Sequence, residues 1–500
     1  MTRLRRTLVG AVLLLVVPGT ALASWVTTGT GMGAGKADSV PAGDAPAVVV
    51  TGRDVAVSWS AAAFDDGTDV SGYRVARYLD GSGISGTVGA SCAGTLTALT
   101  CTETAVPPGD WRYTITPVHH DWTGPEGSLG PIAAVGTPSW SFASSATITS
   151  LPTTLAGTLS DFGTGETVTF RLDAETGLTL SGSTIPDPIP FAGTATTSVT
   201  IPAGTSDGIH EIFAVGSGGS VASSIVTIDT TGPVVSGAVI GKLQGGRPGF
   251  VKQGGTYHVY ANVSDPTSGV ATVSANVSTV TTGSTVVALT SGAWTVDGTS
   301  YGYRSALLTA SNPLTAGTKT FSITAADTVG NAGTTGGFSV TVDNTRPSPS
   351  DAQVANGGAT VGKPEAGDIV TLTYSEAMEP VSILAGWDGT STSVTVRVIQ
   401  AGGQDRLQVW NAGNTAQLPV GQLRLGRADL VTANVAFTGS TMTLSGGVIT
   451  VVLGTPSGAT GTAAGTGTIT WTPSATATDL AANACNAVNR TEGGAADIDF

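Results

Sequence analysis

Two stretches decide the fold: IVTIDTTGPVV at Ile225–Val235, and its echo VTVDNTRPSP at Val340–Pro349. In each, a short alternating apolar run reaches an aspartate, then small polar residues, then a proline. Such runs are typical of β-strands, and proline ends the ladder of a central strand. Asp229 and Asp343 are 114 residues apart (343 − 229), about the length of one β-sandwich. The pattern predicts consecutive β-domains that meet near these two aspartates.

The composition favours strands and turns over helices. Of 500 residues, 70 are Gly and only 11% are charged, against a usual share of about 25%. Val and Thr are abundant, while Lys, Glu and Leu, which build helices, are scarce. A hydrophobic share of 40% is enough to build packed cores. We predict an all-β protein made of tandem β-sandwiches in an elongated array.

The net charge of −14 limits the partners of the chain. A protein that binds nucleic acid needs a basic face, so we expect no nucleic-acid partner. The same acidity disfavours electrostatic docking to anionic lipid.

The first residues have the pattern of a secretory signal peptide. Arg3, Arg5 and Arg6 precede the apolar run Leu8–Val17, and Ala21-Leu22-Ala23 supplies the small residues that a signal peptidase needs. We predict a signal helix over residues 1–23 and a flexible leader over residues 24–44. The mature chain carries no apolar run long enough to cross a bilayer, so we expect a secreted, extracellular protein that is either free or associated with the cell envelope.

The range 45–136 contains alternating runs separated by turn clusters, as in a sandwich of about seven strands. Trp59 closes an early strand, GYRV follows, and PPGDWRYTITPV comes next. This pattern resembles a fibronectin type III domain. The resemblance implies that Trp59 is the core tryptophan. It also implies that Tyr113 is the corner tyrosine, whose hydroxyl bonds back to the backbone.

The rest of the chain resembles other modules of secreted bacterial proteins. The range 137–229 ends with AVGSGGSVASS (residues 214–224) and SSIVTID, and it resembles an Ig-like module of actinobacterial surface proteins. The range 230–344 contains SDPTSGVATV, AADTVGN and TVDNTRP, and it resembles the repeated Ig-like domains of bacterial adhesins. Residues 345–500 begin with GDIVTLTYSEAMEPVSI, which is similar to the Ig-like domain of surface-layer proteins. There ATDLAAN (Ala477–Asn483) fits the closing D-x-x-G-N turn, except that Ala482 replaces the glycine. This last range has room for an inserted hairpin or a small second unit.

The three cysteines divide into a pair and a single residue. Cys92 and Cys101 flank a stretch that an antiparallel pair can bring together, and in an exported chain we expect a disulfide there. Cys485 is left over. A buried free thiol is our first interpretation and intermolecular pairing the second.

The adhesin resemblance also implies calcium. In such arrays, loop aspartates hold Ca²⁺ at or near the domain junctions, and Ca²⁺ prefers six to eight oxygen ligands. The alternative is that Asp and Asn only form the turns that cap strand ends. The candidate ligands, matched position by position, are Asp229, Asp265, Asp327, Asn331 and Asp343.

Three patterns that could suggest other chemistry are better explained as structure. GTSDG, with Ser206 and the nearby His210, fits G-x-S-x-G, but the motif lies in a turn between strands rather than at a strand-to-helix elbow. His119 and His120 are adjacent in a strand and should point to opposite faces. The pair Glu376 and Glu379 sits at a turn. We therefore predict no catalytic residues, no cofactor other than structural Ca²⁺, and no enzyme activity.

We expect a non-catalytic cell-surface or extracellular protein that acts as a structural spacer, adhesin or matrix component. Its partner would be a surface protein or polysaccharide, or further copies of itself. The alternative is a carbohydrate-binding accessory protein for extracellular polysaccharide processing. That role would show as exposed aromatic side chains on one sheet face. The available residues are Trp111, Trp122, Trp140, Trp294, Trp387 and Trp410.

Overall fold

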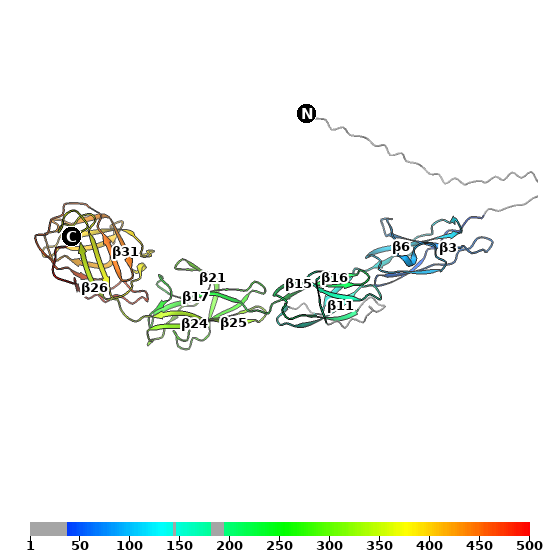
Figure 1. The fold of residues 1–500 in the computed structure, drawn as a ribbon, viewed down its shortest axis with the longest axis horizontal. Helices are drawn as coiled ribbons and strands as arrows, with labels where there is room; N and C mark the ends of the chain where they lie inside the picture. Colours follow the sequence, from blue (N-terminus) through cyan, green and yellow to red (C-terminus); the bar gives the residue numbers. More distant parts are fainter. Residues whose placement is uncertain (1–37, 144–146, 182–194) are drawn as a thin grey trace, which may run out of the picture. The chain divides into compact units, whose positions relative to one another are not determined.

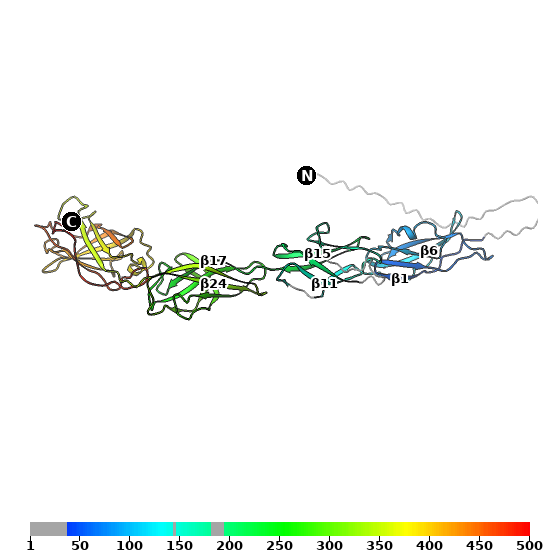
Figure 2. The same cartoon turned by 60° about the horizontal axis from the view of Figure 1, so that its bottom comes forward.

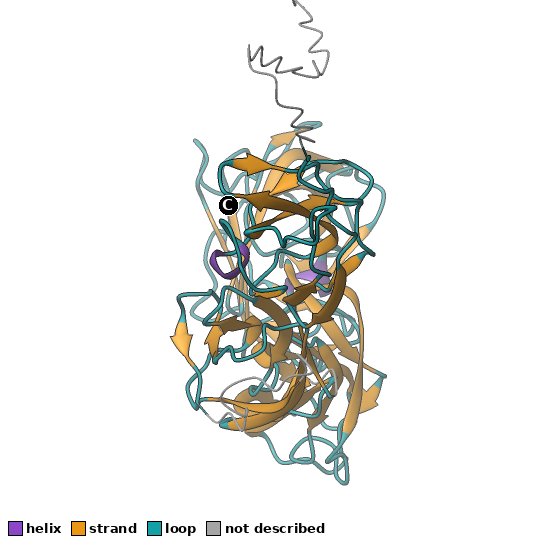
Figure 3. Cartoon of the chain, turned by 90° about the vertical axis from the view of Figure 1, so that its right-hand side faces the viewer, coloured by secondary structure: helices purple, strands orange, loops and turns teal. Residues whose placement is uncertain are grey.

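The computed structural model describes residues 38–143, 147–181 and 195–500. The predicted signal peptide and residues 24–37 of the predicted leader lie outside these ranges. Strands and loops make up almost all of the described chain, with helical turns only at Ala90–Cys92 and in α1 (Pro380–Ile383) (Figure 3). The all-β prediction is confirmed. None of the helices in the described ranges has the length and apolar character that a bilayer span requires.

Four separate hydrophobic cores organise the described residues. The chain divides into one compact unit up to Thr137 and a second from Pro138 onward. The first unit has one core, and the second has three, in successive stretches of chain (Figure 1). We call the parts that carry these cores domains 1 to 4; their cores span Val55–Val135, Trp140–Ile228, Ile240–Val342 and Ala352–Phe500.

Domain 1 is a sandwich of two antiparallel sheets, ordered β1-β2-β5 and β4-β3-β6-β7, with β8 also paired to β6. Alternation sets which side chains are buried, as in β5, where Cys101 and Glu103 point inward. Its strands are β1 (Ala47–Thr51), β2 (Asp54–Ser58), β3 (Gly72–Leu79), β4 (Ser85–Gly86), β5 (Thr100–Glu103), β6 (Gly109–His119), β7 (Trp122–Thr123) and β8 (Ala133–Val135).

Domain 2 is also a two-layer sandwich, and Figure 2 shows β11 and β15 in its separate layers. One sheet runs β10-β16-β15-β12-β13 and the other β14-β11-β9. The short β10 pairs in parallel with the last strand, β16. The strands are β9 (Ser139–Phe142), β10 (Thr147–Ile148), β11 (Thr153–Ser160), β12 (Val168–Leu172), β13 (Leu178–Thr179), β14 (Ala195–Ile201), β15 (Gly208–Gly216) and β16 (Val221–Ile228).

Domain 3 joins its strands into one continuous sheet ordered β17-β19-β22-β21-β20-β24-β25-β18, with β23 paired to β19. Its short β18 pairs in parallel with the last strand, β25, as β10 does in domain 2. The strands are β17 (Val234–Lys242), β18 (Phe250–Val251), β19 (Thr256–Ser264), β20 (Val270–Asn276), β21 (Val287–Val296), β22 (Thr299–Ser305), β23 (Leu308–Thr309), β24 (Gly317–Asp327) and β25 (Ala332–Val342).

Domain 4 has a single core that runs to Phe500, so its extra length builds one larger unit instead of a second one. Its sheet is ordered β26-β27-β32-β31-β28-β29-β30-β34-β35, with β33 paired to β31. The strands are β26 (Pro349–Ala355), β27 (Ile369–Tyr374), β28 (Thr392–Ile399), β29 (Arg406–Asn411), β30 (Gln417–Arg424), β31 (Val435–Ser445), β32 (Val448–Val452), β33 (Thr455–Pro456), β34 (Thr470–Thr472) and β35 (Arg490–Thr491).

Candidate metal centres at the domain junctions

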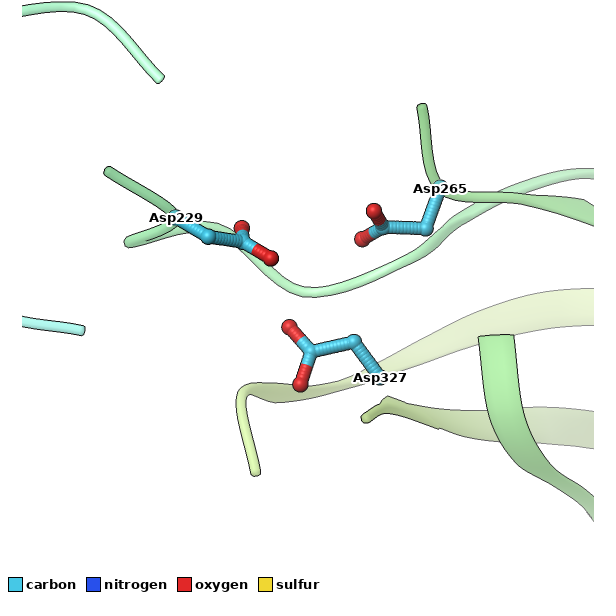
Figure 4. A group of neighbouring side chains, drawn as sticks. All are labelled: Asp229, Asp265 and Asp327. Atoms are coloured by element: carbon cyan, nitrogen blue, oxygen red, sulfur yellow. The ribbon is translucent and has the colours of Figure 1, made fainter. Parts of the chain in front are cut away.

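Three aspartates meet where domain 2 gives way to domain 3. Asp229 follows the last strand of domain 2, Asp265 follows β19, and Asp327 ends β24. One oxygen of each carboxylate lies within 4.8 Å of the others, and Figure 4 shows the three groups turned toward one another. We call these residues junction cluster A.

The loop Asp327–Asn331 supports this cluster. Oδ1 of Asp327 accepts hydrogen bonds from the backbone N–H groups of Val329, Gly330 and Asn331, at 2.9, 2.6 and 2.8 Å. The side-chain amide of Asn331 donates to Oδ2 of Asp327 and to the carbonyl oxygen of Asp229, both at 2.8 Å. Asn331 therefore ties the loop of domain 3 to the end of domain 2.

Asp229 is the unusual member of cluster A. Its side chain is completely buried, and neither carboxylate oxygen has a hydrogen-bond partner among the residues that the structure describes. A buried carboxylate normally needs hydrogen bonds, a counter-charge or a metal. Without them, moving the charged group out of water costs roughly several kcal/mol. Two further carboxylates within 4.8 Å make that cost larger. A divalent cation between the three groups would remove it.

A second cluster of the same kind lies where domain 3 gives way to domain 4. Asp343 follows β25, Glu376 follows β27 by two residues, and Asp479 starts the turn Asp479–Asn483. One oxygen of each again lies within 4.8 Å of the others. Oε1 of Glu376 is shielded from solvent and has no hydrogen-bond partner in the ranges that the structure describes. We call these residues junction cluster B.

Cluster B repeats the hydrogen bonds of cluster A. The side-chain amide of Asn483 donates to Oδ2 of Asp479 at 2.8 Å and to the carbonyl oxygen of Asp343 at 2.9 Å. Oδ1 of Asp479 accepts from the backbone N–H groups of Ala481 and Asn483, both at 2.8 Å. The two junctions are therefore built on one plan: a strand-end aspartate from one domain and two carboxylate loops from the next.

The turn in cluster B forms even though alanine replaces glycine. Gly330 has a φ of 101° in the first turn, and Ala482 has a φ of 68° at the matching position of the second. Both values lie in the left-handed region, which glycine adopts without strain and alanine does not. The alanine in place of the glycine of D-x-x-G-N thus makes the turn less stable but does not change its conformation.

The electrostatics of the clusters indicate a place for positive charge. Burial, with repulsion from Asp343 and Asp479, raises the pKa of Glu376 to about 7. Burial also raises the pKa of Asp479, against hydrogen bonds from the Asn483 side chain and backbone. Burial works in the same direction at Asp327, but there the hydrogen bonds, led by those of Asn331, outweigh it and the net pKa is lowered. Repulsion between carboxylates thus adds to burial at Glu376 and Asp479 in cluster B.

A buried ion pair lies beside cluster B. Nζ of Lys242, in domain 3, is 2.6 Å from Oε2 of Glu379, in domain 4, and both side chains are only 3% exposed. The backbone N–H of Arg247 donates to the same oxygen, and Nζ of Lys252 donates to the carbonyl oxygen of Ala482. Glu379 is therefore a structural partner of domain 3 and lies outside the group that faces Asp343.

The structure brings together four of the five predicted ligands, Asp229, Asp265, Asp327 and Asn331. Asp343, the fifth, belongs to the other junction. Sequence reasoning missed Glu376, Asp479 and Asn483 as its companions. The recurrence of D-x-x-x-N in DTVGN and DLAAN is the signal that could have found two of them.

The two histidine patterns lie in or next to strands β6 and β15. The expectation that His119 and His120 point to opposite faces is wrong: their rings lie 4.4 Å apart, because His120 has a φ of 52° and breaks the strand alternation. Even so, they join no cluster of three ligand-type side chains in the described residues. His210 lies 3.0 Å from Asp173, but its Nε2 contacts the carbonyl oxygen of Ser206 at 2.9 Å. That bond leaves the Ser206 hydroxyl without the base that a nucleophile requires.

Domain 1 contains the predicted disulfide and core residues. Cys92 and Cys101 form a disulfide with a Cα–Cα distance of 5.4 Å. Trp59 packs edge-on against Tyr73 in the core. Tyr113 is completely buried, but its hydroxyl donates to Oε2 of Glu103 at 2.8 Å, so the expected bond to the backbone is wrong.

Cys485 is a free and buried thiol, as first interpreted. Burial raises its pKa to about 11, and Glu376 adds to this while Arg346 opposes it. A buried, protonated thiol is a poor partner for a second chain.

The six tryptophans do not form an exposed row. Trp140 and Trp387 are buried. Arginine guanidinium groups lie over Trp111, Trp294 and Trp410, at 4.4, 4.9 and 3.5 Å from the ring centres. Only Trp122 is largely exposed, at 74%. It lines a pocket of about 470 Å³ with Phe64 and His119.

No protein-family model and no curated protein matches the chain. Among solved structures, the titin domains I67–I69 are 13% identical with a TM-score of 0.22, over 61% of this chain and 96% of that one. SGBP-B of Bacteroides ovatus, solved with a mixed-linkage heptasaccharide, is 13% identical with a TM-score of 0.15, over 83% and 98%. The fibronectin(III)-like modules of Clostridium thermocellum CbhA are 14% identical with a TM-score of 0.17, over 41% and 92%. These low scores carry no argument about function, and the assignment of tandem β-sandwich domains rests on the strand pairing described above.

Proposed function

We propose that this chain is a secreted, non-catalytic extracellular protein in which Ca²⁺ fixes the junctions between domains 2 and 3 and between domains 3 and 4. Its tandem β-sandwich domains would serve as a structural spacer, adhesin or matrix component. The observation that carries the proposal is the repetition of one acidic plan at two successive junctions.

The plan couples two domains through one ion. In cluster A, Asp229 comes from domain 2, while Asp265 and Asp327 come from domain 3. In cluster B, Asp343 comes from domain 3, while Glu376 and Asp479 come from domain 4. An ion bound by all three carboxylates would link the end of one domain to the loops of the next. Without it, the three negative charges repel one another across the junction.

Calcium suits these ligands better than a softer metal does. Each cluster offers carboxylate oxygens only, with backbone carbonyls nearby, and such oxygen donors select hard cations. Extracellular modules of this kind bind Ca²⁺ with dissociation constants of about 0.1–1 mM. A site is half filled when the Ca²⁺ concentration equals its dissociation constant, so Ca²⁺ several-fold above that constant would keep both junctions filled.

Small-angle X-ray scattering of the full chain, with and without Ca²⁺, tests the coupling. We expect Ca²⁺ to narrow the distribution of interatomic distances. The double variant Asp229→Asn/Asp479→Asn should lose this response, while the exposed control Asp388→Asn should keep it. Scattering that is identical with Ca²⁺ and with chelator would overturn the proposed function.

Fractionation of cells that produce the protein tests the location. We expect to find the chain in the envelope or the medium, with residues 1–23 removed and Ser24 as its first residue. A chain that keeps residues 1–23 and stays in the cytoplasm would contradict secretion. Envelope material that resists detergent and is released by chelator would favour an assembly role.

A second candidate function, carbohydrate binding, is favoured by the pocket beside Trp122. An exposed indole can stack against a sugar ring, and Phe64 adds a second apolar wall. In native gels, a soluble polysaccharide in the gel should slow the migration of the wild-type chain but not that of the Trp122→Ala variant. Equal mobility of both chains in every gel would reject this candidate.

A further inference from the structure

A third acidic cluster lies inside domain 4 and shares no residue with either junction cluster. It consists of Glu492, Asp497 and Asp499, and we call it the tail cluster. One oxygen of each carboxylate lies within 4.8 Å of the others. Glu492 and Asp499 are 9% and 1% exposed, while Asp497 is open to solvent. The cluster therefore has two buried walls and one accessible side.

The buried oxygens of the tail cluster lack partners. Within the described part of the chain, neither Oδ1 nor Oδ2 of Asp499 has a hydrogen bond, and Oε1 of Glu492 has none either. Native proteins pair nearly all buried polar atoms, so three unpaired carboxylate oxygens in one place require an explanation. A bound group that supplies positive charge would satisfy all three.

The neighbouring side chains do not supply that charge. Against the effect of burial, the positive charge of Arg427 works to lower the pKa of Asp499. However, the guanidinium group of Arg427 forms its salt bridge with Asp429 and donates a hydrogen bond to the carbonyl oxygen of Gly465. Asp351 adds a further negative charge near Glu492. Burial, with repulsion from Glu492 and Asp497, raises the pKa of Asp499 to about 7. The group is thus costly to ionise in the absence of a cation.

The tail cluster sits where the segment 492–500 folds back on domain 4. The backbone N–H of Glu492 donates to the carbonyl of Ile469, and that of Gly467 donates to the carbonyl of Asp497. The side chain of Phe500 is completely buried in the core. The backbone N–H of Gly362 donates to the carbonyl oxygen of Phe500, and Gly493 donates to Asp351 and accepts from the side chain of Gln353. The segment is therefore held by hydrogen bonds at both ends and by the buried Phe500, with the carboxylates between them.

We propose that Glu492, Asp497 and Asp499 bind a hard divalent cation that fastens the segment 492–500 to the edge of domain 4. The site uses ligands from a single domain, so it goes beyond the junction function and does not depend on it. Carboxylate donors alone select Ca²⁺ over softer metals, and Ca²⁺ is the probe of choice. The accessible carboxylate of Asp497 provides the entry side.

Hydrogen–deuterium exchange of the full chain, followed by mass spectrometry of peptides that cover residues 467–500, tests this site. If exchange requires release of the ion, Ca²⁺ at ten times its dissociation constant should slow exchange about 11-fold. We expect Asp499→Asn to lose this protection. Asp497→Asn should also lose it, and because Asp497 is exposed this variant should fold normally.

The junction double variant Asp229→Asn/Asp479→Asn separates the two proposals. It should keep the Ca²⁺ protection of residues 492–500 even if it loses the junction ions. Protection that persists in both Asp497→Asn and Asp499→Asn would overturn the tail site. Loss of the protection in the junction double variant would also overturn the tail site. The same holds if exchange in the wild-type chain is equally fast with and without Ca²⁺.

Discussion

The side-chain amide of Asn331 donates a hydrogen bond of 2.8 Å to the carbonyl oxygen of Asp229, across the boundary between domains 2 and 3. Asn483 makes the equivalent bond to Asp343, at 2.9 Å, at the next boundary. Each asparagine also bonds the first aspartate of its own loop. One side chain thus shapes the carboxylate loop and attaches it to the preceding domain.

Asn331→Ala should therefore weaken the junction and domain 3 together. The substitution removes two hydrogen bonds and leaves acceptors without a donor, which costs about 1–3 kcal/mol. Denaturant unfolding, followed by tryptophan fluorescence, measures the free energy of unfolding. The matched control Asn486→Ala changes an exposed asparagine in domain 4 and should have little effect. Equal values for the two variants would argue against the role given to Asn331.

Asp229→Asn should leave the free energy of unfolding unchanged or raise it in chelator, and should lower it in Ca²⁺. In chelator the variant loses a buried charge that has no partner, so it should be as stable as the wild type or more stable. In Ca²⁺ it should lack the stabilisation of a bound ion, which is about 2.7 kcal/mol at a concentration 100 times the dissociation constant. Calorimetry under both conditions measures this. A variant that is less stable by the same amount in both would indicate a purely structural aspartate.

The calcium-free chain should lose stability as the pH rises toward neutral. The pKa of Glu376 in the folded chain is about 7, above its value in an unfolded chain. The folded state therefore holds a proton that the unfolded state releases between about pH 4 and 7, and the free energy of unfolding falls through that window. Urea unfolding in chelator, at steps of pH, measures the slope. Glu376→Gln should reduce the slope without abolishing it, because Asp499 also has a pKa of about 7 in the folded chain; an unchanged slope would contradict the assignment.

Ala482→Gly should stabilise domain 4, and Gly330→Ala should destabilise domain 3. Both positions have positive φ, where alanine costs about 1 kcal/mol or more relative to glycine. A Cβ on Gly330 would meet no atom within 4 Å, so the cost there comes from the backbone alone. We expect shifts of about 0.5–1 kcal/mol in opposite directions. Shifts of the same sign would show that the two turns are not equivalent.

Lys242→Met should destabilise the contact between domains 3 and 4 by about 3–5 kcal/mol, because it leaves Glu379 buried without its partner. The double variant Lys242→Met/Glu379→Leu should recover much of this loss. A double-mutant cycle on the free energy of unfolding gives the coupling. A coupling near zero would show that the ion pair does not hold the two domains.

Much of the fold could be predicted from the sequence, because the alternation of apolar residues in strands and the prolines that follow strands are local features. The resemblance to adhesin domains named Asp229, Asp265, Asp327, Asn331 and Asp343 as ligands, but it did not show that Asp343 belongs to a different junction from the other four. It could not place Glu376, which follows its strand by two residues instead of one. The tail cluster was also out of reach, because Asp499 meets Glu492 only after the segment folds back on the sheet.

A calcium titration of the full chain by isothermal calorimetry tests the central claim most directly. The junction account predicts that Asp229→Asn and Asp479→Asn each remove one bound Ca²⁺ per chain and that the double variant removes two. The exposed control Asp388→Asn should leave the stoichiometry unchanged. If both junction variants bind as much Ca²⁺ as the wild type, or if the wild type binds none, the junction clusters are not calcium sites.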